Sequence, residues 1–104
     1  IGANQIVNRF FSPSEKNNLS NLNPEKLRTE VLKYWIAKES AIKWQRGTIN
    51  KDLSKWEWEK DNKIAIHSKE SHRVIIYQEK YSNWYLSLAY DEKNVNLFPI
   101  LCIK

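Results

Sequence analysis

Residues 23–47 read NPEKLRTEVLKYWIAKESAIKWQRG, and this stretch decides the fold because it predicts one long helix. Asn23 can cap the first turn, and Pro24 suits the first helical position. Apolar side chains then recur at helical spacing, at positions 27, 31, 35 and 42. Gly47 is a typical residue to end a helix, so we expect this one to run from Pro24 to about Trp44.

The segments that follow carry the pattern of an antiparallel sheet. Residues 64–67, 73–80, 84–90 and 95–103 are rich in β-branched and aromatic side chains, and short polar turns separate them. Strands joined by such turns pair as antiparallel neighbours. We therefore predict an α+β fold, with one long N-terminal helix packed on an antiparallel meander of about four strands.

Two shorter regions are less regular. Thr48 or Asn50 can cap a short helical turn that reaches about Lys55, and residues 55–60 then alternate strictly, which favours a strand. In the last strand Pro99 cannot donate a hydrogen bond, so we expect an edge position or a bulge there.

The chain has 104 residues, the size of one domain. Residues 11–23 are rich in Ser, Asn and Pro, which favour turns, so we predict a flexible arm or linker at 1–23 before a single α+β domain at 24–104. Apolar residues at positions 6, 7, 10 and 11 allow an alternative, a short helix or plug that packs on the domain. The start at Ile1 and the lack of Met indicate a piece excised from a longer chain.

Charge and composition bound the function only loosely. The chain carries 17 basic and 12 acidic residues, a formal charge of +5, which favours acidic partners. No run approaches the about 18 apolar residues that a membrane span needs, although an upstream membrane anchor is compatible with the sequence. The single cysteine, Cys102, is expected to be a small buried hydrophobe. A chain without disulfides favours an intracellular, reducing compartment.

The sequence offers little that predicts catalysis. His67 and His72 flank an expected turn that contains Glu70, and exposed turn histidines are more plausible there than a metal site. Only Gly2 and Gly47 are present, so there is no Gly-rich phosphate loop. We therefore expect no enzyme, no metal and no cofactor.

Aromatic residues are the unusual feature, with five Trp and five Tyr. Several lie beside basic residues, an arrangement in which rings stack on bases while cations meet phosphates. The competing interpretation is core packing, since aromatics dominate core energetics. The candidate contact residues for a partner or nucleic acid are Lys43, Trp44, Arg46, Trp56 and Trp58.

Two local resemblances accompany these patterns. His72–Asp91, with VIIY and NWYLSLAYD, resembles the central segment of WYL domains, which are Sm-like barrels of bacterial regulators. Trp35, Lys38 and Ile42, followed by Leu53–Trp58, are similar to the C-terminal domain of cyanobacterial and plastid division proteins. The first resemblance implies a regulator domain and the second a membrane-proximal origin.

Together these features predict a non-catalytic accessory or scaffold domain of a larger protein or complex, which contacts a protein partner. An aromatic surplus suits interface cores. The alternative is a nucleic-acid-binding module that uses exposed Trp and Tyr with Lys and Arg.

Overall fold

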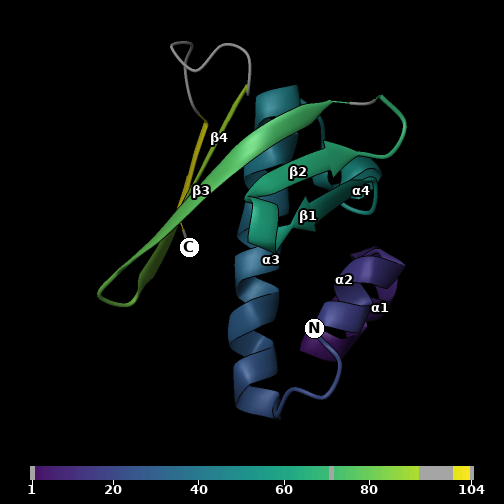
Figure 1. Ribbon diagram of the computed structural model, residues 1–104, viewed down its shortest axis with the longest axis vertical. Helices are drawn as coiled ribbons and strands as arrows, with labels where there is room; N and C mark the ends of the chain where they lie inside the picture. The colour runs from purple at the N-terminus through teal and green to yellow at the C-terminus, as the bar shows by residue number, and fades with distance from the viewer. Residues whose placement is uncertain (1, 71, 92–99, 104) are drawn as a thin grey trace.

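A computed structural model describes residues 2–70, 72–91 and 100–103 (Figure 1). Four helices come first, and a sheet with one short 3-10 helix follows. The elements in chain order are α1 (Ala3–Phe10), α2 (Pro13–Asn18), α3 (Pro24–Gln45), α4 (Ile49–Asp52), β1 (Trp56–Glu59), η1 (Lys60–Asn62), β2 (Ile64–His67), β3 (Arg73–Tyr81), β4 (Trp84–Asp91) and β5 (Ile100–Ile103).

The strands form one sheet in the order β1-β2-β3-β4-β5, and each pairs antiparallel with the next. Helix α3 packs across one face of this meander, so the predicted α+β class and architecture are confirmed. The strand expected from the alternating residues 55–60 is β1, which adds an edge to the four strands of the meander. The turn expected at 91–94 falls largely outside the described residues, as do Pro99 and the side chain of Cys102.

Helix α3 begins as its sequence predicts, but it ends differently. Oδ1 of Asn23 accepts a hydrogen bond from the backbone N–H of Lys26 at 2.8 Å, which caps the first turn. At the other end Arg46, not Gly47, adopts the left-handed conformation, with φ of 65°. The N–H of Gly47 then donates to the carbonyl of Ile42 at 2.9 Å. The expectation that Gly47 supplies the turn is therefore wrong, and this glycine serves another purpose.

The core lies between α3 and the inward face of the sheet. Trp56 and Trp58 are 0% and 4% exposed because alternate residues of β1 face the helix. Ser40 of α3 and Ser87 of β4 are both buried, and their hydroxyl oxygens lie 3.1 Å apart.

Helices α1 and α2 lie on a different side of α3 from the sheet (Figure 1). Val7 of α1 is buried, as are Phe11 and Leu19, which directly follow the two helices, and the Phe11 ring packs on Tyr34 of α3 with centroids 5.7 Å apart. Residues 3–10 and 13–18 are thus helical, and both helices are docked on α3. That residues 1–23 form an arm separable from the domain stays a prediction.

One buried carboxylate, Glu15, joins α2 to α3 and β1. Its Oε1 accepts from Nζ of Lys38 at 2.8 Å, and its Oε2 accepts from the backbone N–H of Trp58 at 2.8 Å. Oε1 also accepts from the N–H of Ser12, whose hydroxyl in turn accepts from the N–H of Glu15, which closes a capping box. Nζ of Lys38 makes a further bond to the carbonyl of Phe10 at 2.9 Å.

Both side chains of the Lys38–Glu15 pair are fully buried. Burial lowers the pKa of Lys38 from its ordinary value because the ammonium loses water, while the negative charge of Glu15 opposes that shift. A buried ion pair is tolerated only when its remaining polar atoms are also bonded. The additional bonds to Phe10, Ser12 and Trp58 meet that condition.

We predict that Lys38→Met destabilises the protein by about 3–5 kcal/mol, because it leaves the Glu15 carboxylate buried without its counter-ion. Chemical denaturation followed by tryptophan fluorescence measures this change. Lys16→Met is the matched control, since Lys16 is an exposed lysine of α2, next to Glu15. It should cost less than about 0.5 kcal/mol. Equal losses in the two variants would contradict the assigned role of the pair.

Candidate functional site

The second half of α3 buries charged and polar residues in an unbroken run. Residues 36–42 are all buried, and they include Lys38, Glu39 and Ser40. The sheet covers one side of this run and the N-terminal helices another, and Glu39, at 6% exposed, is the least buried residue of the run. Lys43 follows as an exposed residue one helical turn after Glu39, on the same face of α3.

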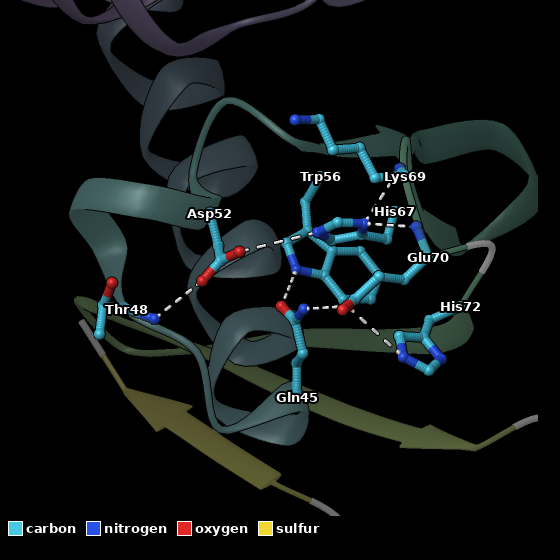
Figure 2. A network of polar contacts seen from close by, with 8 residues as sticks. All are labelled: Gln45, Thr48, Asp52, Trp56, His67, Lys69, Glu70 and His72. Carbon is cyan, nitrogen blue, oxygen red and sulfur yellow. Dashed lines mark hydrogen bonds and ion pairs between the residues drawn. The ribbon is translucent and has the colours of Figure 1, made fainter.

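A polar network closes the C-terminal end of α3 (Figure 2). Asp52 of α4 accepts a hydrogen bond from the N–H of Thr48 at 2.9 Å, and its other oxygen lies 3.7 Å from Nε2 of His67. Nδ1 of His67 accepts from the N–H groups of Lys69 and Glu70 at 3.1 and 3.0 Å. Because Nδ1 acts as an acceptor, the neutral ring carries its proton on Nε2, which faces Asp52.

The same network reaches the sheet through Gln45. Its Oε1 accepts from Nε1 of Trp56 at 2.9 Å, and its Nε2 donates to the carboxylate of Glu70. The rings of Trp56 and His67 meet edge to face at 5.2 Å. His67 is only 3% exposed, so the expectation of two exposed turn histidines is wrong for His67, while His72 is exposed. These groups bond mainly to one another, so the network has a structural role. We call it the joint, because through Gln45, Asp52, Trp56, His67 and Glu70 it connects the end of α3 to α4 and the sheet.

Gly47 leaves room for this joint. A Cβ atom at that position would collide with the carboxylate of Asp52 and would lie 3.1 Å from Oε1 of Gln45. The φ of Gly47 does not lie in the left-handed region, so the backbone conformation is not the reason for a glycine here. The reason is the close approach of the Asp52 and Gln45 side chains.

Two grooves flank the first half of α3. One, of about 530 Å³, lies between α2, α3, β1 and η1, and acidic residues including Glu30, Glu57, Glu59 and Asp61 line it. The second, of about 440 Å³, lies between α3 and the β3–β4 hairpin. We call it the lysine groove, because its lining includes Lys33, Lys60, Lys63 and Lys80 together with Tyr77 and Tyr85.

The structure separates the contact residues expected from the sequence into two groups. Lys43 and Arg46 are exposed at the end of α3, and Trp44 is half-buried with its ring 5.5 Å from that of His72. Trp56 and Trp58 instead face α3 in the core, which is the packing alternative considered for them. A contact role for the first group stays a prediction.

The most exposed aromatics lie elsewhere, on the β3–β4 hairpin. Trp84 is 60% exposed, Tyr81 58% and Tyr77 43%. Trp84 pairs with Tyr81 across the tip, and the hairpin extends away from α3 towards the lower left of Figure 1. Core packing, the competing interpretation for the aromatic residues, therefore does not hold for Trp84. Its strand turns the small residues Ser87 and Ala89 towards α3, so Trp84 lies on the opposite face of β4.

The described part of the chain lacks two features, a cluster of metal ligands and a membrane-spanning helix. Among these residues, no group of three or more His, Cys, Asp or Glu side chains is placed to hold a metal ion. In the same residues, no helix combines the length and the apolar character that crossing a membrane requires.

Comparison with known proteins identifies one family. The family model described as ACPS, 4'-phosphopantetheinyl transferase superfamily, matches residues 2–97. No curated protein and no solved structure matches the chain.

This match overturns the function expected from the sequence. The family is one of transferases, so the prediction of a non-catalytic accessory or scaffold domain is wrong, as is the prediction that the chain is no enzyme. The nucleic-acid alternative is likewise contradicted. The expectation of a protein partner agrees with the family, because its members act on carrier proteins. The misleading evidence was compositional: charge and aromatic content describe a surface, not the reaction that a site performs.

We predict that Gly47→Ala destabilises the protein by about 1–3 kcal/mol, because the new methyl group displaces Asp52 from the joint. Gly2→Ala is the matched control, since a Cβ at Gly2 meets nothing within 4 Å. It should change the free energy of unfolding by less than about 0.5 kcal/mol. Thermal denaturation of both variants tests this. A Gly47→Ala protein as stable as the Gly2→Ala protein would contradict the close approach.

Proposed function

The chain belongs to the 4'-phosphopantetheinyl transferase superfamily, and we propose that it takes part in transferring a 4'-phosphopantetheinyl group to a hydroxyl of a carrier protein. The observation that carries this proposal is the buried charged run of α3 inside a region matched by the family model. Burying ionisable groups in a helix is costly, and such groups concentrate at functional sites.

The reaction is a phosphoryl-type displacement. A phosphorus–oxygen bond of the donor breaks, and a new bond joins phosphorus to the hydroxyl oxygen of the acceptor. The hydroxyl proton passes to a base, and the leaving group departs with the electron pair of the broken bond. Catalysis of such a step rests on positioning the reactants and on offsetting the negative charge of the phosphate.

Residues of α3 suit these two tasks. Lys43 is exposed and supplies a positive charge for a phosphate. Glu39 lies one turn earlier on the same face, and its carboxylate can accept the hydroxyl proton. Lys38 is a positioning residue in this scheme, since its ammonium is committed to Glu15 and Phe10. It holds α3 so that Glu39 and Lys43 keep their places.

Phosphoryl transfer commonly uses divalent cations. In the described part of the chain no three candidate ligands come together. Mg²⁺ is usually held by one or two carboxylates together with substrate phosphates, and the scheme assigns no step to a metal.

We expect Glu39→Gln to lower kcat for transfer to a carrier protein by about 10²-fold, because the amide cannot accept the proton. Lys43→Ala should reduce kcat/KM through weaker binding of the donor phosphate. The measurement is the rate at which a carrier protein gains the 4'-phosphopantetheinyl mass, with the full-length protein as the enzyme.

Lys51→Ala is the control, since Lys51 is exposed on α4 and has no part in the scheme. It should leave the rate unchanged. Wild-type rates in Glu39→Gln, with melting temperatures equal in all variants, would remove Glu39 from the reaction.

A further inference from the structure

His67 lies at the centre of the joint and has no role in the proposed chemistry (Figure 2). Its ring is 3% exposed, and its two nitrogens have different surroundings. Nδ1 accepts hydrogen bonds from the N–H groups of Lys69 and Glu70 at 3.1 and 3.0 Å. Nε2 carries the proton of the neutral ring and lies 3.7 Å from Oδ1 of Asp52, and it hydrogen bonds to none of the residues that the structure describes. The closed joint therefore suits a neutral ring.

A second proton on this ring must go to Nδ1, because Nε2 already carries one. Nδ1 then becomes a donor that faces two backbone donors, so both of its hydrogen bonds are lost. A positive charge is also created in a position that solvent hardly reaches. Histidine is the side chain that ordinarily changes charge between about pH 5 and pH 8, so acid is the condition that opposes the closed joint.

The charged groups around the ring do not remove this conflict. Those that titrate or carry charge are Asp52 of α4 and Lys69, Glu70 and His72 of the segment between β2 and β3. The neighbours from α3 and β1, Gln45 and Trp56, are neutral. Asp52 favours a positive ring, but it faces Nε2, not the nitrogen that takes the second proton. The ring of His72, 6.5 Å away, repels a positive ring once it is protonated itself.

Loss of the Nδ1 bonds reaches the last turn of α3 through Glu70. The carboxylate of Glu70 accepts from Nε2 of Gln45, whose Oε1 accepts from Nε1 of Trp56 at 2.9 Å. By these two bonds Gln45 connects the end of the helix to β1 and to the segment that follows β2. Lys43, the phosphate ligand of the proposed scheme, lies two residues before Gln45 in the same turn.

We propose that the joint is a pH-sensitive switch at the end of α3. It is closed while His67 is neutral, and it opens when Nδ1 is protonated, which frees the last turn of the helix from the sheet. Acid favours the open form, because the second proton leaves no backbone donor buried without an acceptor there. An effect on transfer rests on the proposed function, through Lys43, whereas the switch itself does not.

The test is ¹⁵N NMR of the imidazole and indole groups in the full-length protein, from about pH 7.5 to about pH 5. At the upper end we expect the Nε2–H tautomer of His67 and a hydrogen-bonded indole N–H of Trp56. As Nδ1 takes up its proton, the Trp56 indole signal should shift upfield, and the melting temperature should fall by about 5 °C. Protonation of the ring without a shift of the Trp56 signal would overturn the proposal, and this measurement needs no variant.

His67→Asn removes the titration but keeps the acceptor, because the side-chain oxygen of Asn can bond the N–H groups of the two or three residues that follow it. Its Trp56 signal and melting temperature should stay constant over the same pH range. His72→Asn is the matched control, since it removes the exposed histidine, and it should respond to pH as the wild type does. A wild-type response in His67→Asn, or a lost response in His72→Asn, would overturn the proposal. None of these measurements uses transfer, so absence of transfer would overturn the proposed function alone.

Discussion

The buried pair of Lys38 and Glu15 is the interaction on which the arrangement of this protein depends. The carboxylate of Glu15 binds the ammonium of Lys38 and the N–H groups of Ser12 and Trp58, so one side chain fastens α2 to both α3 and the edge strand β1. An edge strand presents unpaired backbone groups, and here one of them has a buried partner. Because the second half of α3 is enclosed by the sheet and by the N-terminal helices, its buried charged residues Lys38 and Glu39 stay in fixed positions.

The long helix and the meander are predictable because their signals are local. Asn23 and Pro24 mark the start of α3, and polar turns separate the strands. The role of Lys38 is not predictable in this way, because its partner lies 23 residues earlier, in a segment whose composition suggests a linker. A lysine in a helix is assigned to solvent unless its counter-ion is known. His67 illustrates the same limit, since Asp52 and two backbone N–H groups surround it only in the folded chain.

The candidate site was predictable only in part. Alternation shows that Trp56 and Trp58 share a face, but it cannot say whether that face meets a helix. Trp84 also begins an alternating strand and is nevertheless exposed, because it lies on the face of β4 opposite to Ser87 and Ala89, which are buried. The charged run on α3 was visible in the sequence as Lys38, Glu39 and Lys43. Its meaning depends on burial, and the transferase family was recognised from the whole of residues 2–97.

Amide hydrogen exchange at Ser12 and Trp58 tests most directly whether Glu15 fastens the N-terminal helices to the rest of the fold. Both N–H groups donate to the Glu15 carboxylate. The structure predicts that the amide of Trp58 exchanges only through global unfolding, and that the amide of Ser12 is strongly protected. Exchange at both positions as fast as at the exposed Asn62 of η1 would show that the buried pair does not form, and would contradict the account.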